Sequence, residues 1–273
     1  MRFLGNVLAT VIGIFVFMML SFFGIILIGV IFGGDSETVE VENNSVIELN
    51  LSDISDDYAG KYSDPWVTAF SERKKIGLTD VINAIEIAET DDAIKGISIL
   101  NTNSSLGMAQ SKELRDALNR FKKSGKFIYS YANNYSQKEY YLNSVATSIY
   151  INPIGELDFK GLSTEVMFFK DFQEKSGLKM EVIRHGKYKS AVEPFLENKM
   201  SDANKEQTMA LLNGIWTNIV EDISKSRNIP VEKLNTIANG LLARTPEMAK
   251  AQNLIDYIAY EDVYHNAIRK VLK

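Results

Sequence analysis

The amino-terminal segment is the feature that most constrains this chain. From Phe3 to Gly34 there is no ionisable side chain, and the residues from Val7 to Phe32 are almost all apolar. A helix of that length rises roughly 39 Å, which exceeds the roughly 30 Å hydrocarbon core of a lipid bilayer. The sequence therefore predicts a transmembrane anchor within residues 1–34, with the lipid bilayer as its partner.

Two other interpretations of this segment fit less well. A cleavable signal peptide has an apolar region of about 7 to 15 residues before a small-x-small site, whereas this run is longer and ends in Gly33-Gly34-Asp35. A buried core helix rarely has an uncharged run of this length.

Positive charge lies at Arg2 and the amino terminus, and acidic residues follow the run. The positive-inside rule therefore places the amino terminus in the cytoplasm and the body on the extracytoplasmic side.

The composition of the chain excludes several kinds of site. Because there is no Cys, the chain has no disulfide, thiolate zinc site, iron-sulfur cluster or thiol nucleophile. The two histidines, His185 and His265, are far apart in the sequence, which argues against a His-rich metal site. A net charge of -5 leaves no basic excess for a phosphate backbone, so nucleic acid is not an expected partner. No metal or organic cofactor is expected.

The rest of the chain has the pattern of alternating strands and helices. Residues 35–44 are mostly polar and acidic and are interpreted as a tether, and residues 45–273 as one folded domain. Strand-like apolar runs there alternate with segments whose apolar residues repeat every three or four positions, which favours an α/β domain with a largely parallel sheet. The expected strands are 45–51, 96–100, 127–132 and 148–151, with a loop at 53–64 and an extended segment at 178–184. The expected helices cover 111–123, 166–175, 204–226 and 261–272. Two further helices are expected, one capped by Thr79 and one that starts at Pro246.

One segment after 178–184 combines residue types that carry chemistry. Lys187 and Lys189 are followed by Ser190 and by apolar residues, so one lysine side chain has a place to be drawn inward. A lysine acts as a base only when neutral, burial lowers the pKa of a lysine, and Ser-Lys dyads use this to deprotonate a serine hydroxyl. From the residue types alone, a surface lysine is the favoured interpretation, and His185 is favoured as a structural residue rather than a general base.

The same segment resembles a known motif. The string from Gly186 to Phe195 resembles the lysine motif of the long, two-repeat signal peptide peptidases called SppA or protease IV. The amino-terminal anchor is also similar to theirs, and the likeness covers nearly the whole chain. Further strings similar to their first repeat are Asn133–Leu142, Asn152-Pro153, Gly155, Gly161-Leu162 and Met200-Ser201.

This resemblance has implications for fold and site. It implies a crotonase or ClpP-like fold for residues 45–273, as the amino-terminal half of a longer enzyme. It places the catalytic base of a Ser-Lys dyad on Lys189 and makes Lys187 a flanking residue. It also implies a homo-oligomeric ring, with a tetramer as one candidate size.

The nucleophile of that family does not carry over to this chain. In one-repeat members the serine precedes a Tyr-Tyr pair, which is marked here by Tyr140-Tyr141, and the serine position falls on Gln137. An amide is no nucleophile, and Ser136, one place off, is expected to point elsewhere. Residues 101–107, where a Gly-rich segment should supply oxyanion donors, are also altered. In the two-repeat family the serine belongs to the second repeat, so this chain is expected to be inactive alone.

Two functions from different classes follow as expectations. The first is a membrane-anchored serine endopeptidase of the bacterial inner (cell) membrane that degrades cleaved signal peptides or other apolar extended peptides. This chain would contribute Lys189 as the base for a serine from another segment. The second is a non-catalytic assembly or binding module of the same fold, in which Lys189 is a buried or paired cation.

Overall fold

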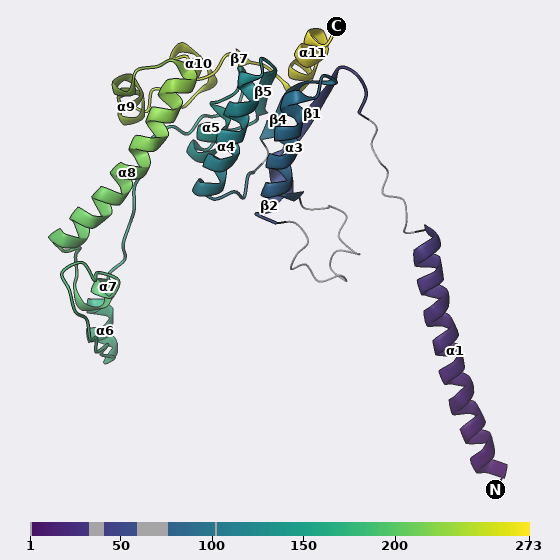
Figure 1. The fold of residues 1–273 in the computed structure, drawn as a ribbon. Coiled ribbons are helices and arrows are strands. Elements are labelled where there is room, and N and C mark those ends of the chain that lie inside the picture. The colour runs from purple at the N-terminus through teal and green to yellow at the C-terminus, as the bar shows by residue number, and fades with distance from the viewer. Residues whose placement is uncertain (1, 33–40, 59–75, 102) are drawn as a thin grey trace. The chain divides into compact units, whose positions relative to one another are not determined.

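The computed structural model describes residues 2–32, 41–58, 76–101 and 103–273 (Figure 1). These fall into two compact units, one over residues 1–41 and the other over residues 42–273. The predicted tether at 35–44 lies mostly outside the described residues. The domain boundaries drawn from the sequence stay a prediction.

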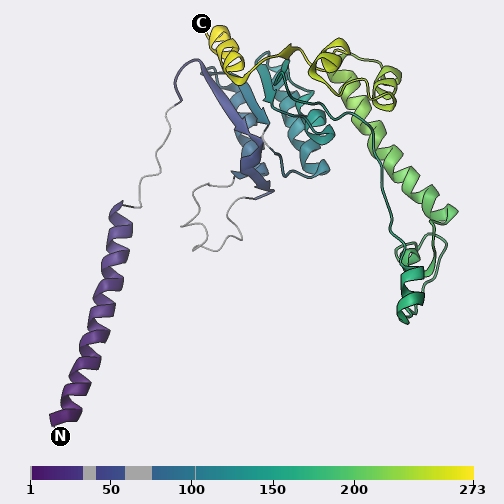
Figure 2. The same cartoon turned by 180° about the vertical axis from the view of Figure 1, so that it is seen from behind.

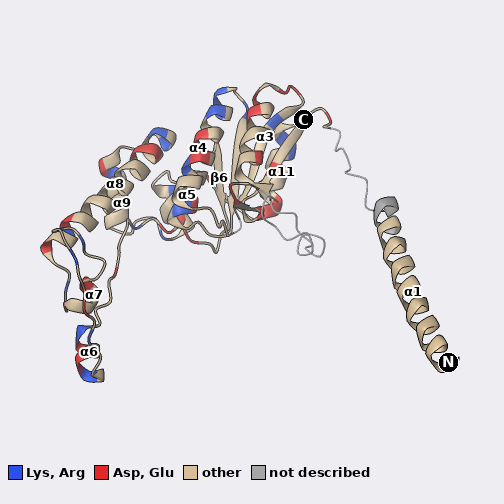
Figure 3. Cartoon of the chain, turned by 60° about the horizontal axis from the view of Figure 1, so that its bottom comes forward, with Lys and Arg blue, Asp and Glu red and all other residues tan. Residues whose placement is uncertain are grey.

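The first unit contains helix α1, Arg2–Phe32. Its stretch Arg2–Leu27 has a mean hydropathy of 2.6, and none of that stretch is buried within the chain. In Figure 3 charged residues of both signs are spread over the second unit, whereas α1 is tan over nearly all its described length. By length and composition α1 can cross a membrane, which fits a membrane-anchored protein.

The second unit is built on a parallel five-stranded sheet in the order β1-β4-β5-β6-β7. A separate parallel pair joins β2 to β3. The expected α/β class with a largely parallel sheet is therefore confirmed. The strands are β1 Ser45–Asn50, β2 Ile54–Asp56, β3 Ile76–Gly77, β4 Ile94–Asn101, β5 Phe127–Ala132, β6 Ser148–Ile151 and β7 Tyr257–Ile258.

Alternating residues of β5 divide the core between the two sheet faces. Ile128 and Ala132 face the main apolar core, which includes buried residues of helices α3 (Leu78–Thr90), α4 (Met108–Lys123) and α5 (Gln137–Asn143). Figures 1 and 2 show α3 and α4 lying over one face of the sheet. Tyr131 instead joins a smaller cluster with Tyr150 and with Tyr264 of α11, Glu261–Val271. The alternation follows from the two-residue period of a strand.

The chain between β6 and β7 contains the remaining helices. Of these, α8 is the longest, and only the half nearer its carboxyl end contributes to the core, through Ile219, Val220 and Ile223. Ile229 and Leu234, which follow α8, belong to the same core. The bounds are α6 Lys170–Ser176, α7 Glu193–Leu196, α8 Asp202–Arg227, α9 Val231–Asn239 and α10 Pro246–Ala251, and a short 3-10 turn covers Leu51–Asp53.

Several local expectations are wrong at the ends of elements. Gly77, not Thr79, is the residue before α3. The expected loop at 53–64 includes strand β2, and its residues beyond Tyr58 lie outside the described part. The helix expected over 166–175 begins only at Lys170. Residues 178–184 pair with no strand of the described sheets.

Candidate active site

The turn that carries Lys189 is exposed and lies between α6 and α7. Gly186 has a φ of 108°, which a residue with a Cβ atom rarely adopts. This lets the chain reverse, so that the Lys189 amide donates to the Gly186 carbonyl at 3.4 Å. The Glu193 amide then donates to the Ser190 carbonyl at 2.9 Å. The extended segment expected at 178–184 is not part of a strand in the described structure, and the turn instead depends on these local hydrogen bonds.

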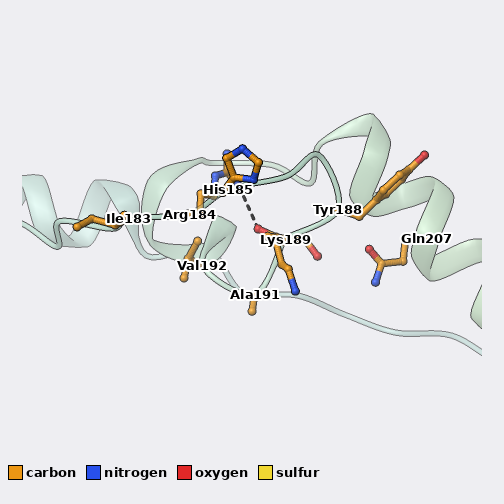
Figure 4. Close-up of a pocket in the computed structure, with 9 residues that line it drawn as sticks. Ile183, Arg184, His185, Tyr188, Lys189, Ala191, Val192 and Gln207 are labelled. Carbon is orange, nitrogen blue, oxygen red and sulfur yellow. Dashed lines mark hydrogen bonds between the residues drawn. The ribbon is translucent and has the colours of Figure 1, made fainter.

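Lys189 lines an open pocket of about 480 Å³ (Figure 4). The wall of the pocket comes from residues 183–185 and 188–192, with Gln207 of α8. The Lys189 side chain is exposed and points away from the His185 imidazole, which is also exposed. The expectation that the lysine is buried or paired is therefore wrong for the single chain, because no described element of the chain packs over the pocket.

Lys187 has two neighbours that favour its charged form. Its Nζ lies 3.4 Å from the Tyr188 hydroxyl and 3.8 Å from a Glu206 carboxylate oxygen. The Tyr188 hydroxyl, followed by the Glu206 charge, raises the pKa of Lys187 above its ordinary value. Because a base must be neutral, this environment favours Lys187 as a flanking cation.

Glu193 is the one residue from 162 to 203 that is buried, at 2% exposure. Its carboxylate accepts hydrogen bonds from the Ser201 hydroxyl at 2.5 Å, the Ser201 amide at 3.2 Å and the Asn204 side chain at 2.9 Å. The Ser201 hydroxyl bond, with help from Asn204, lowers the pKa of the Glu193 carboxyl. Arg184 Nη1 lies 3.9 Å from the same carboxylate and donates to the Lys189 carbonyl at 3.3 Å. Glu193 thus connects the start of α8 with the turn of Lys189.

Gln137, at the position expected for the family's serine, makes backbone contacts. Its Oε1 accepts from the amides of Lys160 and Gly161 at 3.0 and 2.8 Å, and its Nε2 donates to the Gly161 carbonyl at 2.9 Å. The Gln137 side chain therefore fixes the chain just before the exposed segment that leads to α6. Neither Gln137 nor Ser136 lines the pocket of Lys189.

Ser136 caps α5 rather than facing a cavity. Its hydroxyl accepts from the Glu139 amide at 3.4 Å and donates to the Glu139 carboxylate at 2.7 Å, and the Ser136 amide donates to that carboxylate at 3.0 Å. This is a capping box, which holds the first turn of a helix. The other Glu139 oxygen accepts from the Ser104 amide at 3.0 Å. A backbone donor in the segment expected to form the oxyanion hole is thus occupied by Glu139.

Among the residues that the structure describes, no group of three or more His, Asp or Glu side chains is arranged to hold a metal ion. His265 lies far along the chain in α11 and pairs with Glu261 at 3.4 Å. The two histidines therefore belong to separate parts of the second unit.

Comparison with known proteins identifies the family. The sequence pattern of "Peptidase family S49" matches residues 120–273, more than half of the chain. The chain belongs to peptidase family S49. The matched residues include α5, the Lys189 turn and α8. The resemblance stated from the sequence motifs is confirmed, and the parallel sheet is consistent with the ClpP-like fold of S49 peptidases.

Named relatives of this S49 chain are proteases. "Protease 4" of Haemophilus influenzae is 36% identical over 77% of this chain, and "Protease 4" of Salmonella typhi is 33% identical over 71%. "Serine protease SPPA, chloroplastic" of Arabidopsis thaliana is 30% identical over 81%. The matches cover 35%, 32% and 31% of those proteins, so the chain spans about a third of their length.

Two residues of the Lys189 turn, Glu193 and Arg184, stand out only in the structure. Their contacts join residues 184, 189, 193 and 201 across several turns, which no sequence pattern marks. A signal for part of this was present, since Ser201 three residues before Asn204 has the spacing of a helix cap. The helix was instead expected to begin at Asn204.

Proposed function

We propose that this chain is the lysine-bearing part of a membrane-anchored serine endopeptidase that degrades cleaved signal peptides. Lys189 is the general base, and the nucleophilic serine comes from another segment. The observation that carries the proposal is the Lys189 turn, which has the family's lysine motif and opens the amine toward a pocket. The S49 family and the protease names of the relatives support the reaction class.

The chemistry assigned to Lys189 is proton transfer. Its neutral amine removes the proton of the serine hydroxyl while the serine oxygen attacks the peptide carbonyl. The resulting ammonium then donates that proton to the leaving amine as the peptide C–N bond breaks, and an acyl-enzyme remains. Water, deprotonated by the same amine, releases the acid product and restores the serine.

The proposal requires a second surface over the Lys189 pocket. Burial favours the neutral form of a lysine, and in the single chain the Lys189 side chain is exposed. The region around it also exposes large apolar side chains, including Ile183 and Phe172. We propose that another segment carrying the serine covers this region in a homo-oligomeric ring. The substrate is then an apolar extended peptide, bound between the two surfaces.

The anchor determines where such an enzyme works. We propose that α1 spans the bacterial inner (cell) membrane with its amino terminus in the cytoplasm, so that residues 42–273 lie on the extracytoplasmic side. The charge difference across the ends of α1 supports this orientation. Reporter fusions after residue 44 should be active only when the reporter works outside the cytoplasm, and a cytoplasmic signal would reverse the assignment.

The test of the proposed function is hydrolysis of a signal-peptide-like substrate by the chain assembled with the proposed serine-bearing segment. Lys189→Ala should remove the activity and leave assembly intact. Lys187→Ala is the matched control, because it removes a neighbouring lysine of the same motif, and it should keep most of the rate. An unchanged rate for Lys189→Ala would refute the role of this amine.

A non-catalytic assembly module is the second candidate. It is favoured by the hydrogen bonds that occupy Gln137, Ser136 and Glu139 in this chain. If the assembled protein binds its partner equally well with and without Lys189 and hydrolyses no peptide, the module is the correct function. Loss of hydrolysis with intact assembly in Lys189→Ala excludes it.

A further inference from the structure

We propose that Glu193 is a positioning residue that fixes the Lys189 turn to the first turn of α8. This inference rests on the proposed function, because it assigns Glu193 a role in the reaction of Lys189. It starts from the burial of a carboxylate in a segment that is otherwise at least partly exposed. A buried charge is costly unless hydrogen bonds satisfy it, so its contacts determine the local geometry.

Glu193 makes contacts with both the start of α8 and the turn of Lys189. On one side, the Ser201 hydroxyl and the Asn204 side chain donate to the carboxylate. Ser201 also accepts from the Asn204 amide at 3.2 Å, so the same serine caps α8. On the other side, the Glu193 amide closes the turn that begins at Ser190, directly after Lys189. The carboxylate and amide of a single residue therefore connect the helix start with the lysine turn.

Arg184 makes the second connection. Its Nη1 lies 3.9 Å from Glu193 Oε1 and donates to the Lys189 carbonyl at 3.3 Å. The dashed line in Figure 4 marks the contact with the Lys189 carbonyl. The Arg184 guanidinium thus lies between the Glu193 carboxylate and the backbone of the lysine. The apolar core is not part of this arrangement, so loss of Glu193 should move Lys189 while the sheet stays folded.

The discriminating variant is Glu193→Gln. Glutamine has nearly the same shape, but its amide group brings a donor toward Ser201 and Asn204, which are donors themselves, and it removes the charge that faces Arg184. The matched control is Glu197→Gln, which removes an exposed glutamate four residues away. Both variants change the net charge equally.

The first readout is amide hydrogen exchange of the full chain, which needs no activity. In Glu193→Gln, exchange over residues 189–193 and 201–205 should rise at least about tenfold, as for the loss of a hydrogen bond to a charged group. Exchange in β4 and β5 should be unchanged. Glu197→Gln should match the parent chain. Equal exchange in Glu193→Gln and the parent chain would overturn the inference.

The second readout is peptidase kinetics of the chain assembled with the serine-bearing segment. Glu193→Gln should lower kcat about 10- to 100-fold with little change in KM, as expected when a catalytic group is displaced but the substrate site remains. A normal kcat in Glu193→Gln, together with an inactive Lys189→Ala, would refute positioning by Glu193 and leave the proposed function standing. Full activity of Lys189→Ala would instead refute the proposed function, and with it the catalytic role of Glu193.

Discussion

Gly186 shows how one residue can decide the position of a functional side chain. The positive φ at Gly186 reverses the chain, so that the amide of Lys189 reaches back to the Gly186 carbonyl. In Gly186→Ala the Cβ atom should cost roughly 1–2 kcal/mol in this conformation, and the turn should relax away from it. We expect the assembled enzyme to lose most of its peptidase activity.

The same variant should leave the core intact, because the Gly186 turn is exposed. Thermal unfolding of Gly186→Ala, followed by circular dichroism, should therefore coincide with that of the parent chain. Full peptidase activity in Gly186→Ala would show that the turn geometry does not matter for the reaction.

The carboxylate of Glu193 should make the start of α8 sensitive to acid. The Ser201 hydroxyl bond holds the pKa of Glu193 below its ordinary 4.5. Because the folded state favours the carboxylate, its contribution is complete above about pH 4.5 and is lost as the pH falls through the lowered folded value. Amide exchange of Asn204 should therefore accelerate in acid beyond its intrinsic rate. A Glu193→Gln chain should lack this step, and its persistence there would assign the step to another group.

Ser136 provides a test of the assignment of the nucleophile. Ser136→Ala removes the cap of α5 and should lower the free energy of unfolding by about 1 kcal/mol, measured by urea denaturation. The peptidase rate of the assembled enzyme should be unchanged. Turnover of peptide by this chain alone that Ser136→Ala abolishes would show instead that Ser136 is the nucleophile.

At the scale of elements, prediction from sequence succeeded where an element packs within this chain. The ranges expected for β5 and β6 are the observed ranges, because their strand patterns correspond to burial in the sheet. The burial pattern of α3 also follows the expected spacing, with Val81, Ile85 and Ala88 buried. The cap predicted for α3 was wrong. Strand β3 ends at Gly77 and the helix begins at the next residue, before Thr79.

Prediction failed where the packing partner is not another described element of the chain. Val166 and Met167 fall in the segment expected to be helical, yet they are exposed and precede α6. The segment 178–184 has no strand to pair with in the described sheets. For Lys189 the residue types alone favoured a surface position, and its side chain is exposed in the single chain. The motif located the lysine, but the contacts of Arg184 and Glu193 join residues on separate turns and follow no sequence pattern.

Arg115 connects α8 to the helices that cover the sheet by buried hydrogen bonds. Its buried guanidinium donates to the Tyr141 carbonyl, to the Ser144 hydroxyl at 2.7 Å, and to the Asp222 carbonyl and Ser226 hydroxyl at 2.8 and 2.5 Å. It thus joins α4, α5 and α8. Arg115→Met should cost about 3 kcal/mol of stability because it leaves buried acceptors unpaired, measured by urea denaturation.

The control for this variant is Arg120→Met on the same helix. Arg120 forms an ion pair with Glu86 at 2.8 Å, with both side chains about half exposed. Its loss should change the free energy of unfolding by about 0.5 kcal/mol or less. Similar losses of unfolding free energy in both variants would show that the buried Arg115 contributes no more to stability than an exposed arginine.

At the scale of the whole molecule, the second unit should fold without the anchor. Residues 42–273 form a compact unit with their own apolar core. A fragment of residues 42–273 should therefore unfold within about 4 °C of the full chain in detergent, a shift that corresponds to about 1 kcal/mol for a domain of this size. A fragment that lacks a cooperative transition would show that α1 contributes to the fold.

The order of the strands in the sheet also has a consequence for the order in which the second unit folds. β1, β4, β5 and β6 are neighbours in the sheet in the order in which they occur in the chain, with only the separate β2-β3 pair between β1 and β4, so these four can pair before β7 is in place. β7 pairs with β6 only after the chain has passed through α6 to α10. Tyr131 and Tyr150 therefore become buried only when α11 packs against them. During folding this tyrosine-rich face should therefore stay exposed to solvent after most of the sheet has formed.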